Sequence, residues 1–202
     1  MLGNIFIISA ASGTGKTTLV SRLLQKHPDI RASVSHTTRL PREGEENGRH
    51  YHFVSIPEFE AMIGDAGFLE YARVYDNYYG TSMRQLEELT RQGVDVILEI
   101  DVQGAAQVRQ ALPQAASIFI APPSFAVLES RLRGRGTDAP EVIAKRLVEA
   151  RNEIEQAPLF DYLVVNDDLD NAEAALLNII RAKRFLSSAQ EKTLHSLLAE
   201  TR

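Results

Sequence analysis

The sequence predicts an α/β fold in which a parallel sheet is flanked by helices. Apolar runs at residues 5–8, 94–101 and 117–121 have the length and composition of strands buried on both faces. Helical patterns alternate with these runs, as after residues 18 and 103. A glycine-containing turn joins the first run directly to the first helix, which is the arrangement at a phosphate-binding helix N-terminus.

Composition limits the class of protein. The chain has 202 residues, a formal net charge of -5 and no cysteine, which excludes disulfides, zinc-thiolate sites and thiol nucleophiles. The negative balance argues against a general nucleic-acid partner. No apolar run approaches the roughly 18 residues of a membrane span and no leader pattern is evident, so we expect no membrane contact and a soluble, cytoplasmic protein.

The turn has the pattern of a phosphate-binding P-loop. Its residues are Ala10, Ala11, Ser12, Gly13, Thr14, Gly15, Lys16, Thr17 and Thr18. Backbone N–H groups would cradle phosphates, Lys16 would reach the β- and γ-phosphates, and the Thr17 hydroxyl is a typical Mg²⁺ ligand. Ala10 replaces the usual first glycine, and its small side chain makes this tolerable. The order of strand, glycines, lysine, threonine and helix argues against a chance turn, so we expect a P-loop NTPase-type sheet that binds ATP with Mg²⁺.

Residues 33–91 change in character and predict a small mixed lobe. A short polar strand leads into a long loop, in which Arg39 and Arg42 are three residues apart beside the hydroxyls of Ser35 and its neighbours. Two guanidinium groups at this spacing suit a phosphate. The alternative is a solvated loop on which both arginines pair with glutamates at 43–46, and the charge pattern leaves both open.

The rest of the lobe contains a strand at 51–54, a helix at 57–63, a strand at 68–75, a turn at 77–81 and a helix at about 82–91. Tyr51 and Tyr79 lie beside polar loops, where their hydroxyls can reach a ligand. The next strand, 94–101, ends with Glu99 and Asp101, which we expect on one face at the ligand crevice. Asp101 is a candidate Mg²⁺ group and Glu99 a candidate substrate contact. The alternative is a solvated strand end.

Two helices, from about residues 125 and 140, flank an arginine cluster and predict a hinged lid. Arg131, Arg135 and Arg146 can act on transferring phosphates, although solvated helix-end arginines are an alternative for Arg131. A final strand at 162–166 precedes a long helix at 172–186. Asn166 ends this strand at the crevice, where an amide can read a base.

Together these residues resemble the guanylate kinase family of nucleoside monophosphate kinases over nearly the whole chain. The resemblance rests on the P-loop and on the segments 35–39, 41–42, 44–48 with Tyr51, 77–81, 100–104, 134–137 and 165–168. It implies phosphoryl transfer from ATP to GMP in purine nucleotide metabolism, with a closing lid that excludes water. Departures from the family pattern are Ala10, Glu99 in place of aspartate, and Thr81 where some members have serine.

The resemblance also implies roles for residues. The catalytic set is Lys16, Arg42, Arg135 and Arg146. The substrate-binding set is Ser35, Arg39, Arg42, Glu45, Tyr51, Glu70, Tyr79, Gly80, Thr81, Glu99 and Asp101, in which Ser35, Glu70 and Thr81 would read guanine. Arg131, Asn166 and Asp167 would join the P-loop in binding ATP, and Thr17 and Asp101 would serve Mg²⁺.

We expect one domain, 1–202, with a core (1–32, 92–124 and 158–202), a GMP-binding lobe (33–91) and a lid (125–157). A homo-oligomer is compatible with the long C-terminal helix. Two other functions are open: a guanylate kinase-like protein-interaction module, and a P-loop kinase for ribose bisphosphate. The intact P-loop argues against the first, and the base-reading set argues against the second.

Overall fold

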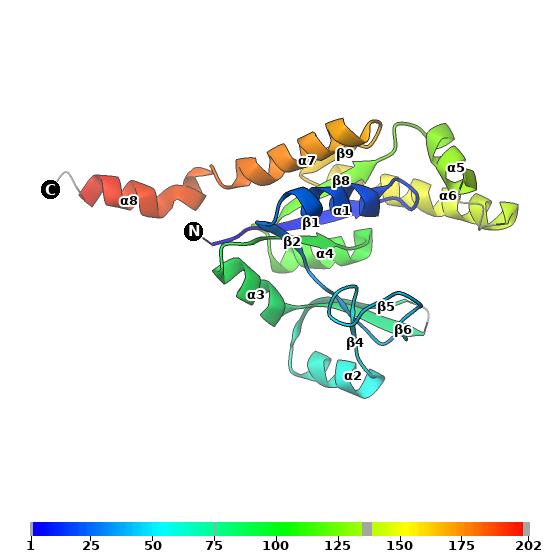
Figure 1. The fold of residues 1–202 in the computed structure, drawn as a ribbon, viewed down its shortest axis with the longest axis horizontal. Coiled ribbons are helices and arrows are strands. Elements are labelled where there is room, and N and C mark those ends of the chain that lie inside the picture. Colours follow the sequence, from blue (N-terminus) through cyan, green and yellow to red (C-terminus); the bar gives the residue numbers. More distant parts are fainter. Residues whose placement is uncertain (1, 75, 135–138, 200–202) are drawn as a thin grey trace.

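The structure is a computed structural model that describes residues 2–74, 76–134 and 139–199. Its main sheet has five parallel strands in the order β2-β7-β1-β8-β9 (Figure 1). The strands are β1 (Ile5–Ala10), β2 (Ile30–Ala32), β7 (Asp95–Glu99), β8 (Ala116–Ala121) and β9 (Tyr162–Val165). The α/β class with a parallel sheet is therefore confirmed, and β1 lies at the centre of that sheet.

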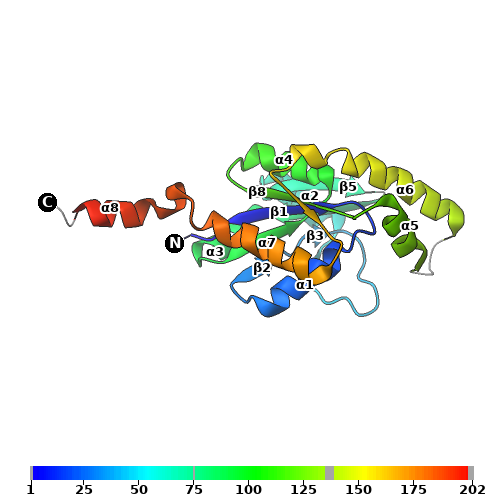
Figure 2. The ribbon, with the colours of Figure 1, turned by 90° about the horizontal axis from the view of Figure 1, so that it is seen from above.

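Helices cover both faces of this sheet (Figure 2). Alternate residues of β1 point to opposite faces, as the strand period requires. Phe6 and Ile8 belong to the core formed with α1 (Lys16–Lys26) and α7 (Leu169–Lys183). Ile7 packs on the other face with Leu86 and Val108, from α3 (Met83–Arg91) and α4 (Val102–Ala111). Burial on both sides explains why the β1 run is apolar at every position.

A second sheet lies below the main one in Figure 1, in the order β4-β3-β6-β5. It contains β3 (His36–Thr37), β4 (His52–Phe53), β5 (Phe68–Val74) and β6 (Asn77–Ser82), with α2 (Ile56–Gly64) packed against it. The fully buried Phe59 of α2 stacks on Phe68 and Tyr78, with ring centroids 4.3 and 5.1 Å away. The turn predicted at 77–81 is wrong, because these residues pair with both β5 and β3 as strand β6.

Two further helices, α5 (Phe125–Gly134) and α6 (Pro140–Ile154), pack at the end of the sheet where β1 leads into the P-loop. Leu128, Leu132 and Ile143 form a third core with Phe119 of β8. Ser124 precedes α5 and its hydroxyl accepts a hydrogen bond from the amide of Val127 at 3.2 Å. A short 3₁₀ segment, η1 (Ala157–Leu159), then leads into β9.

The C-terminal segment, with η2 (Ser187–Gln190) and α8 (Glu191–Ala199), extends away from the body of the molecule (Figures 1 and 2). The helix predicted at 172–186 is α7 and begins earlier, because the Asp168 carboxylate caps its first turn by accepting from the amides of Asp170 and Asn171. In the described part of the chain, no helix has the length and apolar character needed to cross a bilayer.

One strand end and one short strand differ from the prediction. The strand expected at 94–101 ends at Glu99, and Asp101 is instead the N-cap of α4, where its side chain accepts from the amide of Gly104 at 2.8 Å. The expected alternation of Glu99 and Asp101 along one strand face is therefore wrong. Strand β2 was not predicted, since its three residues are too few to carry a periodic pattern.

Candidate functional site

The P-loop joins β1 to α1 and has the geometry that its glycines allow. Gly13 and Gly15 have φ values of 90° and 91°, and Gly15 is the N-cap of α1. A Cβ on Gly13 would lie 2.8 Å from a methyl carbon of Leu132, so this position also lacks room for a side chain. The loop surrounds a pocket of about 310 Å³ lined by Ala10, Ala11, Ser12, Gly13, Thr14, Gly15, Lys16, Thr17, Thr18 and Glu153.

Side chains from the second half of the chain hold the loop from behind. The carbonyl oxygen of Thr14 accepts from the Asn166 amide at 2.6 Å and from Arg131 Nη1 at 3.2 Å. Arg131 also donates to the carbonyl oxygen of Asn166 at 3.0 Å. The Asn166 side chain is buried, and its Oδ1 has no hydrogen-bond partner. These two residues therefore brace the P-loop; a contact between Asn166 and the adenine base stays a prediction.

Lys16 begins α1 and faces the pocket among carboxylates. Burial lowers the pKa of its ammonium, and the charges of Glu99, Asp101 and Glu153 act in the opposite direction. Burial raises the pKa of Glu99, while Lys16 lowers it. Thr17 lies next to Lys16 with its side chain exposed. The lysine is thus the cation around which the acidic residues of this site are arranged.

The second predicted anion site forms around Arg39. Its guanidinium donates to Glu45 Oε1 at 2.8 Å and lies over the Tyr51 ring, 5.5 Å from the centroid. Glu45 Oε2 accepts from the backbone amide of Arg42 at 2.7 Å. The hydrogen bond from the Arg39 side chain has the largest effect on the Glu45 pKa and the Arg42 amide the next largest, and together they lower this pKa to about 2. The rings of Tyr51 and Tyr79 meet edge to face at 6.0 Å. The Arg42 side chain is exposed. The ion pair that the alternative expected is present for Arg39 with Glu45, and the binding of a phosphate by Arg39 and Arg42 stays a prediction.

Glu70 and Thr81 form a buried pair on adjacent strands of the lobe. The Thr81 hydroxyl donates to Glu70 Oε1 at 2.6 Å, and both side chains are almost fully buried. Burial raises the Glu70 pKa, while the Thr81 hydrogen bond lowers it. Gly104, in the first turn of α4, approaches this carboxylate so closely that a Cβ there would lie 3.3 Å from Glu70 Oε2. The carboxylate is therefore fixed where the lobe meets the core.

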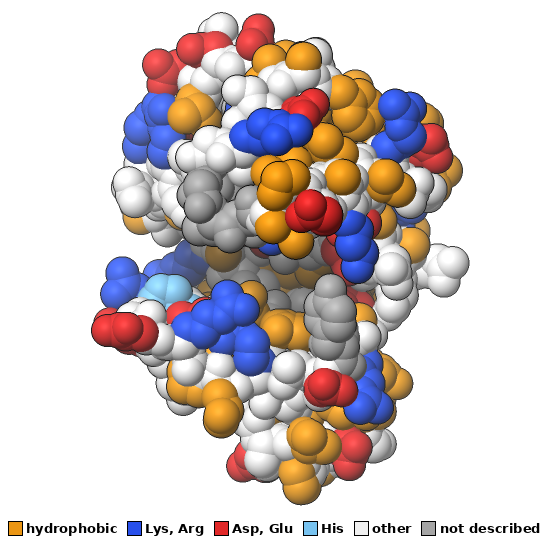
Figure 3. Space-filling view, turned by 90° about the vertical axis from the view of Figure 1, so that its right-hand side faces the viewer, with side chains coloured by type: hydrophobic (Ala, Val, Ile, Leu, Met, Phe, Trp, Pro, Cys, Tyr) orange, Lys and Arg blue, Asp and Glu red, His pale blue; other side chains and the backbone are white. Residues whose placement is uncertain are grey.

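The surface of the molecule is hollowed between the body and the lobe (Figure 3). Figure 3 shows this hollow, with arginine or lysine side chains along the rim of the lobe. Burial is the main cause of the raised Tyr51 pKa, and the charge of Glu99 raises it further. The same carboxylate also raises the pKa of Lys16 in the P-loop. The charge of Glu99 therefore acts both on Lys16 of the P-loop and on Tyr51 of the lobe.

Comparison with known proteins agrees with this geometry. A family model described as guanylate kinase matches residues 3–183. The chain belongs to the guanylate kinase family. It is 65% identical over 196 residues to a guanylate kinase of Neisseria gonorrhoeae, covering 97% of this chain and 96% of the relative. A Salmonella typhimurium guanylate kinase is 51% identical over 200 residues, covering 98% and 97%. A crystal structure of guanylate kinase from Anaplasma phagocytophilum matches with a TM-score of 0.73 and 33% identity, covering 92% of this chain and 88% of that one.

Other residues expected from the guanylate kinase resemblance lie on α6, after β9 and before β3. Arg146 lies on α6 with a partly buried side chain, and Asp167 is exposed beyond β9. Arg135 lies outside the described residues. Ser35 follows the segment held by Gln85, whose Oε1 accepts from Ser33 Oγ at 3.1 Å and from the Val34 amide at 3.2 Å.

One residue at the P-loop was not predicted. Glu153, in the last turn of α6, accepts a hydrogen bond from the Ser12 amide at 3.1 Å through its Oε2. Burial raises the Glu153 pKa, and the Ser12 amide lowers it. One feature of the sequence indicates that Glu153 lies near the site. Arg146 lies seven residues earlier, which is about two turns along the same helix face. The sequence alone does not reveal that this face reaches the loop.

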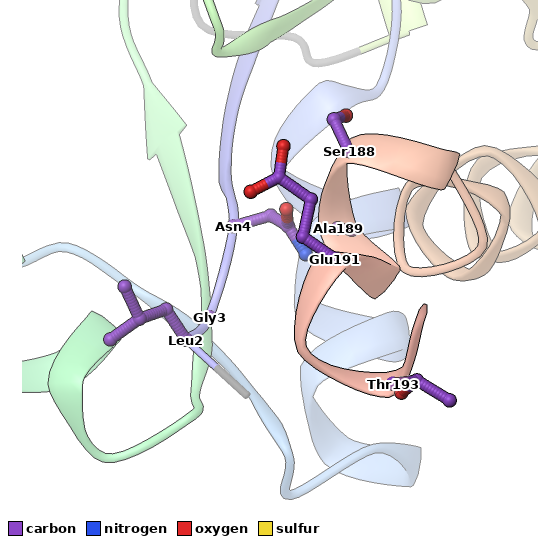
Figure 4. A pocket seen from close by; sticks show the side chains of 7 residues that line it. All are labelled: Leu2, Gly3, Asn4, Ser188, Ala189, Glu191 and Thr193. Atoms are coloured by element: carbon purple, nitrogen blue, oxygen red, sulfur yellow. The ribbon is translucent and has the colours of Figure 1, made fainter. Parts of the chain in front are cut away.

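A second hollow, of about 440 Å³, lies away from this site. It is formed where the residues before β1 meet η2 and α8 (Figure 4), and is lined by Leu2, Gly3, Asn4, Ser188, Ala189, Glu191 and Thr193. The P-loop follows the opposite end of β1. No arginine, lysine or histidine is among these lining residues, so the P-loop pocket is the better candidate for an anionic substrate.

Proposed function

We propose that this chain transfers the γ-phosphoryl group of ATP to GMP, giving ADP and GDP. One observation supports this best: in a chain of the guanylate kinase family, Lys16 and the P-loop line a pocket at the end of β1 that suits a polyphosphate. Phosphoryl transfer requires two phosphates in line, with charge neutralised between them and little covalent help from the protein. The P-loop pocket in the core and the arginine-tyrosine cluster in the lobe are two candidate anion sites for this reaction.

The P-loop is suited to the phosphates of ATP. An anionic oxygen fits there, since the Glu153 carboxylate already accepts from the Ser12 amide. Backbone amides and Lys16 would hold the β- and γ-phosphates, while Asn166 and Arg131 keep the loop in place from behind. An oxygen of the GMP phosphate then attacks the γ-phosphorus, and the bond to the bridging oxygen of ADP breaks.

The lobe is suited to GMP. Arg39, Arg42, Tyr51 and Tyr79 would hold its phosphate, with Glu45 orienting the first two through its carboxylate. Ser35, Glu70 and Thr81 would read guanine. Guanine presents N1–H and a 2-amino group, which a carboxylate can accept, whereas adenine presents an acceptor at N1. Ribose bisphosphate has no base that these three residues could recognise.

Two side chains fit a magnesium ion that accompanies ATP. Thr17 offers an exposed hydroxyl beside Lys16, and Asp101 offers an exposed carboxylate at the start of α4. Both are hard oxygen donors of the kind that Mg²⁺ prefers. When bound, the ion neutralises phosphate charge. Asp101 Oδ1 already accepts a hydrogen bond from the Gly104 amide, so its carboxylate is held at the edge of the site.

We assign residues 125–157 to a lid, 33–91 to a GMP-binding lobe, and the rest to a core within one domain. Arg146, and Arg135 outside the described residues, would act on the transferring phosphate from the lid. Lid closure would exclude water and so limit ATP hydrolysis. Cytoplasmic location and homo-oligomer formation stay predictions, which cell fractionation and light scattering would test.

The direct test is a coupled assay of ADP formation with ATP, Mg²⁺ and a panel of GMP, AMP, UMP and ribose bisphosphate. We expect turnover with GMP far above the others and a loss of about a thousandfold or more in Lys16→Ala. Arg49→Ala is a matched control, because Arg49 is exposed and pairs only with the exposed Glu46 among the contacts described. No turnover with any acceptor would favour an interaction module, and turnover with ribose bisphosphate alone would favour the other kinase.

A further inference from the structure

Glu153 places a carboxylate at the phosphate cradle. Its Oε2 lies 3.1 Å from the Ser12 backbone nitrogen, within the P-loop, and its side chain lines the same pocket as Lys16. The residue comes from α6, more than a hundred positions away in the sequence. It also borders a neighbouring hollow that is lined by Asp101, Glu149, Asn152 and Gln156 among others.

A P-loop amide donates to a phosphate oxygen in the nucleotide complex. A carboxylate oxygen is an acceptor of the same charge sign and similar geometry. One amide cannot give a full hydrogen bond to both, and two anions on one cradle repel each other at short range. The contact between Glu153 and Ser12 is therefore one that a bound polyphosphate would have to replace.

We infer that Glu153 is a lid residue of the ATP site, which occupies the Ser12 amide in the nucleotide-free protein and gives it up to a phosphate oxygen of ATP. Glu153 thereby sets the affinity of the site for polyphosphate. This inference rests on the proposed function, because it takes ATP as the ligand of the loop.

The position of Glu153 gives the exchange a mechanical consequence. Arg146 lies seven residues earlier on α6, which puts both side chains within about 20° of one helix face. While Glu153 accepts from Ser12, the C-terminal end of α6 is held at the P-loop. Loss of that contact on ATP binding frees this end of the lid helix at the moment when Arg146 is required near the phosphates.

A purely structural contact predicts the opposite result. If Glu153 only anchored the lid, its removal would loosen α6 and weaken nucleotide binding. If it competes with phosphate, its removal strengthens binding. The direction of the change in affinity therefore separates the two roles.

The test is calorimetric titration of MgADP and of tripolyphosphate, which lacks a base, into wild type, Glu153→Ala and Glu153→Gln. We expect the dissociation constant to fall by about 3- to 10-fold in Glu153→Ala for both ligands, on the scale of one charge-assisted hydrogen bond after partial screening. Glu153→Gln keeps an acceptor oxygen but loses the charge, so its dissociation constant should fall by a smaller factor. GMP affinity should stay within about twofold, since GMP does not use this amide.

Glu149→Gln is the matched control, because Glu149 is an exposed acid one turn earlier on α6 and lies 3.9 Å from Lys145. It should leave the MgADP dissociation constant unchanged. An unchanged or raised constant in Glu153→Ala, with wild-type thermal unfolding, overturns the inference. If Glu153→Ala does not fold, the same criterion is applied to Glu153→Gln. If the wild-type protein phosphorylates GMP and both variants bind MgADP with the wild-type dissociation constant, only this inference is refuted. If the wild-type protein does not phosphorylate GMP, the proposed function is refuted.

Discussion

Replacing Glu70 by glutamine tests how the lobe distinguishes guanine from adenine. The carboxylate is 7% exposed and accepts a hydrogen bond from Thr81 Oγ1 at 2.6 Å. Glutamine is nearly isosteric, but it has one acceptor oxygen, which must serve either Thr81 or the base. Its NH₂ group would face the N1–H and amino donors of guanine, so at least one hydrogen bond to a charged acceptor is lost.

The expected loss in kcat/KM for GMP follows from those contacts. A hydrogen bond to a charged group contributes about 1.5–3 kcal/mol, and an opposed donor adds to the cost, so about 2–4 kcal/mol is expected, or about 30- to 700-fold. AMP should not suffer this loss, because a glutamine NH₂ can donate to adenine N1. Since burial raises the Glu70 pKa, removing the charge relieves a desolvation cost, and thermal stability should be equal or higher.

Steady-state assays with GMP and AMP measure the ratio of the two kcat/KM values. Glu60→Gln is the control, since Glu60 is an exposed acid on α2 of the same lobe, and it should leave the ratio unchanged. Thr81→Ser keeps the hydroxyl that orients Glu70 and should retain most of the selectivity. A folded Glu70→Gln protein with the wild-type ratio would refute the assignment of guanine recognition to this carboxylate.

Three further predictions follow from other parts of the site. Arg39→Ala should raise the KM for GMP by about 10- to 100-fold, because it removes a partly buried charged donor. Arg49→Ala, on the exposed loop, should not raise it, and equal effects would contradict the phosphate role. Asn166→Ala removes the 2.6 Å bond to the P-loop carbonyl and should weaken MgADP binding by about 10-fold, measured by calorimetry, with GMP affinity unchanged. Burial lowers the His36 pKa from 6.5 to about 4, and the charge of His52 makes a smaller contribution in the same direction. Between pH 6.5 and 4 the unfolded chain therefore binds more protons than the folded chain. The free energy of unfolding falls by about 1 kcal/mol as the pH drops over this range, a value reduced because the ring is only partly buried. Denaturant titrations should show this slope in wild type and a smaller one in His36→Phe.

The features that the sequence predicts well are those set by neighbouring residues. The P-loop turn depends on Gly13 and Gly15, which adopt positive φ, and on the helix that starts at Lys16. The apolar pattern of β1 reflects burial on both faces of the sheet. Such signals are contained within about a dozen residues, and the structure confirms them.

The features that the sequence does not predict depend on distant partners. Residues 77–81 contain asparagine and glycine, which favour a turn, but pairing with β5 and β3 makes them a strand. Gly80 fits this strand because a Cβ there would lie 2.9 Å from the Phe68 ring. Asp101 follows a buried strand, yet it is turned outward to cap α4. In each case tertiary packing decides between two locally acceptable structures.

The P-loop itself combines both kinds of information. Its sequence specifies the turn, but its position is held by Arg131 and Asn166 through the Thr14 carbonyl, and by Glu153 through the Ser12 amide. All three holding residues come from the segment 131–166, which also carries Arg146. On the proposal that residues 125–157 form a lid, we expect nucleotide affinity and lid position to vary together, because Arg131 and Glu153 belong to that segment and both contact the phosphate cradle.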